Sequence, residues 1–198
     1  MATVITDLSM SLDGFVAFPS DEAGLLFDWY SNGDVAVAAP DGMTFHVSEG
    51  SARHLRDLHA NVGAAIVGRR LFDFTGGWGG VSPLGCPVFV VSHTVPEGWP
   101  RADAPFTFVT DGVESAVAQA KATAGEGLVE VSGPNIIQQC LNAGLIDEVR
   151  VSLVPVLLGE GVPMFANLKN APVELEGPRV IEGTGVTHLY YRVRSAGG

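Results

Sequence analysis

Residues that could hold a phosphate group gather at the ends of three predicted strands. They are Gly68-Arg69-Arg70 at the end of AAIVG, Ser92-His93-Thr94 after PVFVV, and Ser132-Gly133-Pro134 after LVEV. Arginines pair with phosphate oxygens, hydroxyl groups donate to them, and a helix that begins at Pro134 directs N–H groups at an anion. Because ligands of α/β sheets bind at the carboxyl ends of strands, the three segments together predict a dinucleotide site. Taken singly, Arg69 and Arg70 can also be read as surface charges, and Gly133-Pro134 as a plain helix start.

The elements that would position these segments alternate between strands and helices. Apolar or β-branched runs predict strands at residues 3–10, 64–68, 87–92, 106–110 and 128–132. Helices are predicted from a cap at Ser48 to Asn61, from a capping-box pattern over residues 111–114 to Gly125, and from Pro134 to Gly144. This alternation is typical of a three-layer α/β sandwich with a mostly parallel sheet.

The last third of the chain has β-type runs with no helical pattern between them. These runs, at residues 148–158, 173–182 and 187–193, predict antiparallel strands beside the parallel ones. Pro155 lacks a backbone N–H, so its strand should be bulged or lie at an edge there. Residues 19–43 are expected to form a loop and residues 195–198 a frayed tail. A chain of 198 residues is predicted to be one domain.

Composition and charge exclude several classes of protein. Hydrophobic residues make up 46% of the chain and charged residues 17%, which favours a packed core over disorder. A net charge of −11 would repel the backbone of a nucleic acid. No signal peptide and no run of roughly 18 apolar residues is found, so we expect a cytoplasmic protein with no membrane partner. Cys86 and Cys140 lack metal-ligand spacing and are expected to be small buried side chains, and no metal site is expected.

Several longer segments resemble a known family. Residues 131–134 (VSGP), 144–149 (GLIDEV), 155–161 (PVLLGEG) and 164–165 (MF) resemble the signature of the dihydrofolate-reductase-like superfamily, in its riboflavin-biosynthesis reductase (RibD C-terminal) branch. Residues 9–17 (SMSLDGFVA) are similar to the first strand and active-site loop of that family, and residues 67–72 (VGRRLF) to its cofactor-binding strand end. The resemblance covers nearly the whole chain and implies the dihydrofolate-reductase-like sandwich.

The resemblance implies NADPH as cofactor and hydride transfer to a small, flat, pyrimidine- or pterin-like substrate. The enzymes it points to are of the 5-amino-6-(5-phosphoribosylamino)uracil reductase type, and it also implies a homodimer. The cofactor-binding residues that it implies are Gly68, Arg69 and Arg70 at the phosphates, Ser92 and His93 on the 2′-phosphate side, and Ser132, Gly133, Ile136 and Ile137 along the pyrophosphate and nicotinamide. Residues 31–45 are longer than the family core requires, which predicts a reshaped substrate pocket.

Hydride transfer also needs a proton donor or a group that polarises the substrate. Asp28 is one candidate, because it precedes Trp29 in an apolar patch and burial raises the pKa of a carboxyl group. Asp13, in the turn after the first strand, is the other, although Asp-Gly is also a common turn. Ser11, Trp29 and Trp78 are expected in the substrate pocket. Trp78 lies in the run GGWGG, where it would either close over a ligand or anchor the packing of the turn.

Two alternatives to an NADPH-dependent reductase stay open at this point. One is a non-catalytic module that binds a nucleotide or only forms a dimer, because a fold alone does not determine an activity. The other is a reductase that uses a flavin or deazaflavin, because the same strand ends would accept another cofactor that carries phosphate.

Overall fold

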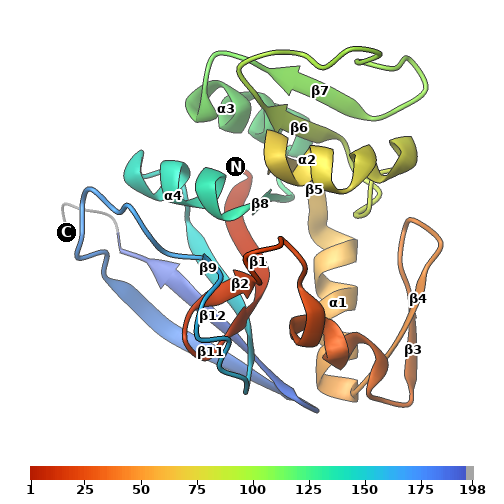
Figure 1. Ribbon diagram of the computed structural model, residues 1–198, viewed down its shortest axis with the longest axis vertical. Helices are drawn as coiled ribbons and strands as arrows, with labels where there is room; N and C mark the ends of the chain where they lie inside the picture. Colours follow the sequence, from red (N-terminus) through yellow and green to blue (C-terminus); the bar gives the residue numbers. More distant parts are fainter. Residues whose placement is uncertain (195–198) are drawn as a thin grey trace.

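The computed structural model describes residues 1–194, and the frayed tail expected at residues 195–198 lies outside the described residues. An eight-stranded sheet forms the middle of three layers, with helices on both faces (Figure 1). The strand order is β11-β12-β9-β1-β8-β5-β6-β7. The strands are β1 (Thr3–Ser11), β5 (Val62–Gly68), β6 (Val88–Val91), β7 (Phe106–Val109), β8 (Leu128–Ser132), β9 (Glu148–Val154), β11 (Leu175–Gly183) and β12 (Val186–Val193).

The directions of the strands confirm the predicted sheet. Every neighbouring pair from β9 to β7 is parallel, whereas β12 runs antiparallel to both β9 and β11. The strand expected at residues 148–158 is shorter than predicted, because β9 ends at Val154. Pro155 follows at once and has no N–H to extend the ladder, so it ends the strand and does not form a bulge within it.

The four α-helices found in residues 1–194 cover the two faces of the sheet in pairs. They are α1 (Glu49–Asn61), α2 (Arg69–Phe74), α3 (Val113–Ala124) and α4 (Pro134–Asn142). Helices α3 and α4 pack on one face, where Val117 and Ile137 join the largest apolar cluster. Helices α1 and α2 lie on the other face, where Leu55 and Phe72 belong to two smaller clusters. Burial on both faces explains why the central strands are continuous apolar runs.

The starts of two helices test the predicted caps. Ser48 caps α1 as predicted, since its hydroxyl accepts a hydrogen bond from the backbone N–H of Ser51. The capping box predicted over residues 111–114 is wrong. Helix α3 begins after Gly112, which has a φ of 106° and makes no side-chain cap. A backbone turn that only glycine adopts readily has replaced the expected side-chain cap.

The loop expected at residues 19–43 is partly regular structure, which corrects the prediction. It contains the 3₁₀ helix η1 (Gly24–Ser31) and the strand β3 (Val35–Ala38), which pairs with β4 (Thr44–Val47). Burial of Leu26 and Trp29 fastens η1 to the body of the protein. The remaining elements are the short pair β2 (Phe15–Ala17) and β10 (Val162–Pro163), and the 3₁₀ turns of η2 (Gly76–Gly80).

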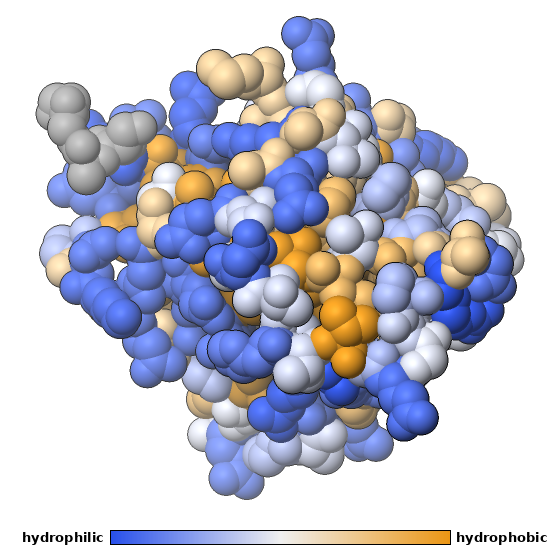
Figure 2. Space-filling view, turned by 90° about the horizontal axis from the view of Figure 1, so that it is seen from above, coloured by the Kyte–Doolittle hydropathy of each residue, from blue (hydrophilic) through white to orange (hydrophobic). Residues whose placement is uncertain are grey.

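The surface is mostly polar, and the face seen from above carries apolar residues in small patches among polar ones (Figure 2). Edge strand β11 is exposed over most of its length, including Leu175 and Val180. The expected homodimer stays a prediction. Among the helices of residues 1–194, none has both the length and the apolar character needed to cross a membrane.

Candidate functional site

A cleft of about 1180 Å³ opens at the carboxyl ends of β5, β6 and β8. The structure brings the three predicted strand ends together in its lining. The predicted site residues that line the cleft are Gly68, Arg69, Arg70, Trp78, Ser92, His93, Ser132, Gly133 and Ile136. Ile137 does not join them, because it is fully buried in the core between α4 and the sheet. Four further predicted residues also lie outside the lining: Ser11, Asp13, Asp28 and Trp29.

Two glycines leave the backbone bare at the centre of this lining. Val67 of β5 is paired with Ser132 of β8, so Gly68 and Gly133 follow side by side. A Cβ atom on Gly68 would lie 2.9 Å from Cγ1 of Ile136, which is too close for a side chain. Gly133 has a φ of 93°, and a Cβ there would lie 3.7 Å from the backbone nitrogen of Gly68. Glycine at position 68 thus lets Ile136 pack against the backbone, and the two glycines form a cradle of bare main chain in the lining of the cleft.

The start of helix α4 offers fewer N–H groups than the sequence suggested. Pro134 has no N–H, and the N–H groups of Ile136 and Ile137 both donate to the carbonyl oxygen of Gly133. An anion at this end would therefore rely less on the helix and more on neighbouring side chains.

Those side chains include Arg69 and Arg70, which both have carboxylate partners. The Arg69 guanidinium donates to Asp73 at 2.8 Å and to the Thr94 carbonyl at 3.1 Å, so it ties α2 to the segment after β6. Arg70 is more exposed and pairs with Asp21 at 2.8 Å. Arg70 and Asp21 belong to distant segments that both line the cleft, and their pair therefore bridges its mouth.

Ser92, His93 and Trp78 complete the open end of the cleft. The Ser92 hydroxyl donates to the Thr94 carbonyl at 2.6 Å, which fixes the turn after β6, while His93 is exposed. Trp78 is half-buried, has a φ of 47°, and stacks on Phe106 with ring centroids 6.2 Å apart. One side of its ring therefore anchors the glycine-rich turn, and the residue also lines the cleft.

Asp13 has a structural set of contacts. Its carboxylate accepts hydrogen bonds from the Ser11 hydroxyl at 2.6 Å and from the backbone N–H groups of Leu158 and Gly159 at 3.1 and 2.7 Å. The Ser11 hydrogen bond, followed by these backbone donors, lowers the pKa of Asp13. A carboxyl group that is harder to protonate is a poor proton donor, and these contacts fasten the turn after β1 to the segment after β9.

The burial expected for Asp28 is wrong, because its side chain is exposed on η1. The apolar patch buries its neighbours instead: Trp29 is 2% exposed, and its ring N–H donates to the Ser9 hydroxyl at 2.9 Å. Residues on a 3₁₀ helix point in different directions from one position to the next, so Trp29 faces the core while Asp28 faces solvent. Neither residue lines the cleft, and a catalytic role for Asp28 stays a prediction.

The sequence interpretation missed two carboxyl groups that do line the cleft. Asp7 of β1 and Glu130 of β8 lie on neighbouring parallel strands and line the cleft, and the Asp7 side chain and the whole of Glu130 are each 3% exposed. Burial raises the pKa of Asp7 to about 7 against the opposing effect of Arg150, and it raises that of Glu130 to about 8. The signal was present in the sequence, since each is a lone acid inside a run of strand residues that must be buried.

The β3–β4 hairpin, which occupies most of the segment predicted to reshape the pocket, does not line the cleft. The hairpin contacts the lining indirectly. Phe45 packs against the ring of Tyr30, with centroids 4.6 Å apart, and Tyr30 lines the cleft. Cys86 and Cys140 are buried, as predicted. Among residues 1–194, no three His, Cys, Asp or Glu side chains are placed to hold a metal ion.

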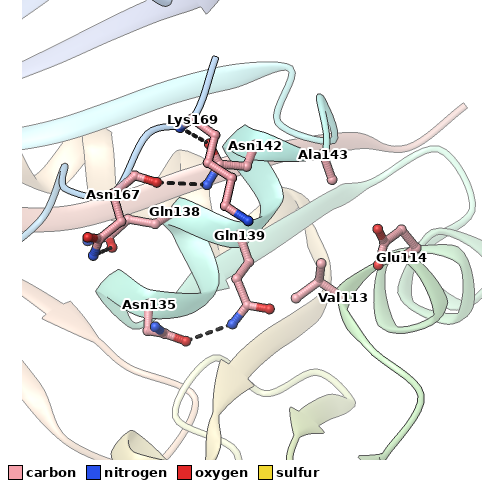
Figure 3. Close-up of a pocket in the computed structure, with 9 residues that line it drawn as sticks. All are labelled: Val113, Glu114, Asn135, Gln138, Gln139, Asn142, Ala143, Asn167 and Lys169. Atoms are coloured by element: carbon pink, nitrogen blue, oxygen red, sulfur yellow. Dashed lines mark hydrogen bonds between the residues drawn. The ribbon is translucent and has the colours of Figure 1, made fainter. Parts of the chain in front are cut away.

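A second hollow of about 490 Å³ lies beside α4 and is lined by amide side chains (Figure 3). These amides bond to one another and to the chain around them: Gln139 donates to Asn135 at 2.7 Å, and Asn142 donates to the Asn167 carbonyl at 3.0 Å. Asn142 also accepts the backbone N–H of Lys169 at 2.7 Å. The contacts hold the segment around Asn167 on α4, and we assign this hollow a structural role.

Comparison with known proteins relates the chain to one family. The sequence model of the RibD C-terminal domain matches residues 2–182. The uncharacterized protein YyaP of Bacillus subtilis is 28% identical over 182 residues, which cover 84% of this chain and 81% of YyaP. The crystal structure of a putative riboflavin biosynthesis protein from Shewanella sp. PV-4 has a TM-score of 0.72 and 26% identity, and the match covers 98% of this chain and all of that one.

The structure of dihydrofolate reductase from Enterococcus faecalis, complexed with NADP(H), has a TM-score of 0.58 and 12% identity. The match covers 98% of this chain and 97% of the reductase. It shows that this chain has the dihydrofolate-reductase-like fold.

Proposed function

Because the chain belongs to the RibD C-terminal domain family, we propose that it is a reductase that uses NADPH to reduce a small, flat, pyrimidine- or pterin-like substrate. The observation that carries the proposal is the cleft at the carboxyl ends of β5, β6 and β8. Its open end combines bare glycine backbone with cationic and hydroxyl side chains, and its closed end is lined by apolar side chains and two buried carboxyl groups. The open end suits a dinucleotide, and the closed end suits a small ring.

The residues at the open end fit a cofactor that carries several phosphates. Gly68 and Gly133 line the cleft without side chains, and this bare backbone allows a pyrophosphate to contact the main chain. Arg70 and His93 are exposed at the mouth, where they can meet the 2′-phosphate that distinguishes NADPH from NADH. Ser92 and Ser132 add hydroxyl groups to the same lining.

When bound, NADPH supplies the hydride, and the residues of this chain position the two reactants. Ile136 and Val67 present apolar surface beside the cradle, against which a flat ring can pack. Trp78 and Phe74 from the α2–η2 segment and Phe27 from η1 line the cleft and would limit the access of water. The substrate ring would then lie toward Asp7 and Glu130.

The test is a titration with NADPH and NADH followed by nicotinamide fluorescence, and then an assay of NADPH oxidation. The two substrates to offer are 5-amino-6-(5-phosphoribosylamino)uracil and dihydrofolate. We expect tighter binding of NADPH than of NADH, and substrate-dependent oxidation with the uracil compound. Binding of NADPH with no oxidation by either compound would favour a non-catalytic module. No binding of NADPH would contradict the proposal, and a yellow purified protein would point to a flavin.

A further inference from the structure

The closed end of the cleft has an unusual chemical character. Its lining includes Leu58 of α1, Ala65 of β5 and Tyr30 of η1, together with Asp7 and Glu130. The basic side chains that line the cleft are Arg69, Arg70 and His93, and all three follow strand ends at the open end. Within the described chain, no cation therefore lines the closed end, and an anionic ring would meet only acids there. A neutral ring is the ligand that this end accepts.

Asp7 and Glu130 differ in how many oxygen atoms they can offer to such a ring. One carboxyl oxygen of Glu130, Oε1, already accepts a hydrogen bond from the Ser132 hydroxyl at 2.5 Å. Among residues 1–194, Asp7 Oδ2 is buried without any hydrogen-bond partner. Asp7 Oδ1 lies 3.6 Å from Nε2 of His54, which is too long for a hydrogen bond. A buried oxygen without a partner is costly, and a bound ligand would remove that cost.

Titratable and charged groups face Asp7 from five neighbouring elements. His54 and Asp57 face it from α1, Glu130 from β8, Arg150 and Glu148 from β9, Tyr30 from η1, and Tyr190 from β12. Burial lowers the pKa of His54 to about 3, so this ring is neutral and does not form an ion pair with Asp7. The His54 ring is held by the Tyr190 hydroxyl at 2.6 Å and stacks on His188, with centroids 4.0 Å apart.

Of these groups, only Arg150 favours ionisation of Asp7 strongly. Its Nε donates to Glu148, whereas its Nη1 lies 3.8 Å from Asp57 and has no hydrogen-bond partner among residues 1–194. Burial outweighs Arg150, and the pKa of Asp7 rises to about 7, so a large share of the molecules keep this proton at neutral pH.

We propose that Asp7, in its protonated form, binds the lactam edge of the substrate ring, where a ring N–H lies next to a C=O. A carboxylic acid has one O–H donor and one C=O acceptor side by side, and it therefore pairs with a lactam through two hydrogen bonds. An ionised carboxylate would only accept and would face the lactam carbonyl with a negative charge. The inference rests on the proposed function and names the part of the substrate that this site recognises.

The test uses uracil as the probe, with 1,3-dimethyluracil as its matched control because it keeps both carbonyl groups but has no N–H. Binding to the NADPH-loaded protein is measured by saturation-transfer NMR between pH 6 and 8.5. For the wild-type protein, we expect the affinity for uracil to fall about tenfold per pH unit above pH 7, since the protonated fraction of Asp7 falls at that rate. We expect 1,3-dimethyluracil to bind at least tenfold more weakly at pH 6 and to show no such fall.

The variant Asp7→Asn separates this role from a merely structural one. An amide is also a donor and an acceptor side by side, so the variant should keep the affinity for uracil that the wild type has at pH 6. It should also lose the decrease in this affinity above pH 7, which we call the alkaline fall. Asp34→Asn, at an exposed aspartate before β3, is the matched control and should behave like the wild type. Glu130→Gln should keep the alkaline fall.

Three results would overturn the inference: equal binding of the two probes by the wild type, an alkaline fall that persists in Asp7→Asn, or one that disappears in Glu130→Gln alone. If Asp7→Asn does not fold, the comparison of the two probes on the wild type still tests the inference. Failure of the proposed function is recognised separately, because it appears as a lack of NADPH binding or oxidation, whereas the comparison of the two probes is also made on the protein without NADPH.

Discussion

Glu130→Gln should make the protein more stable in alkaline solution, because it replaces a buried carboxyl group by an amide that cannot ionise. The pKa of Glu130 is raised from 4.5 to about 8, chiefly by burial. The folded protein therefore holds this proton more tightly than the unfolded chain does, and the free energy of unfolding falls as the pH rises between these two values. At about 1.4 kcal/mol per pH unit, the loss is about 3 kcal/mol at pH 7 and about 5 kcal/mol above pH 8. Glutamine has nearly the same shape, still accepts from Ser132, and cannot ionise.

The measurement is urea unfolding of the wild type and the variant at pH 5, 7 and 9. At pH 5 the two proteins should differ little, and at pH 9 the variant should be more stable by about 3–5 kcal/mol. Glu97→Gln, at an exposed glutamate, is the control and should change little at any pH. A difference between Glu130→Gln and the wild type that stays constant from pH 5 to pH 9 would refute the reasoning, because it would mean that Glu130 titrates alike in the folded and unfolded states.

Two further predictions concern the open end of the cleft and the turn after β1. Arg69→Ala and Arg70→Ala should each weaken NADPH binding about tenfold more than NADH binding, because a charge-assisted hydrogen bond to the 2′-phosphate is lost. A fluorescence titration with each cofactor measures this difference. An equal loss of affinity for both cofactors would show that these arginines are ordinary surface charges. Asp13→Asn should speed the hydrogen–deuterium exchange of the Leu158 and Gly159 amide hydrogens, because a carboxylate acceptor is replaced by a weaker amide acceptor. Unchanged exchange rates would count against these two hydrogen bonds. The pKa of Asp13 is lowered in the folded protein, so its stabilising effect is present above its ordinary pKa and is lost as the pH falls through the lowered value.

The sheet could be predicted from the sequence because its central strands are buried on both faces. Runs such as residues 64–68 and 128–132 contain almost only apolar residues between turn signals, and they leave little choice of element or of position. The segment around Trp29 gave no such signal. Only Leu26 and Trp29 of η1 are buried, and a pattern of two buried residues is too short to show the period of a helix.

The candidate site, like the fold, could be predicted from the sequence only in part. Gly68, Ser92 and Gly133 were predicted to act together because each follows a strand of a parallel sheet, and the topology alone brings such ends to one edge. Asp7 and Glu130 could not be predicted to share a site, because their proximity depends on which strands are neighbours in the sheet. β8 pairs with β1 although most of the chain separates them, and only this pairing puts two acids in one buried space.

The ion pair between Arg70 and Asp21 at the mouth of the cleft affects how cofactor binding responds to ionic strength. Binding of a phosphate to a free arginine weakens as salt is added, because counterions screen the attraction. A phosphate of the proposed cofactor that bound Arg70 would compete with Asp21, and salt weakens the original pair as well as the new one. Since one surface ion pair is exchanged for another, the two effects oppose each other. If the proposed NADPH binds at Arg70, its affinity should therefore change little between dilute and concentrated salt, although the protein has an excess of acidic residues.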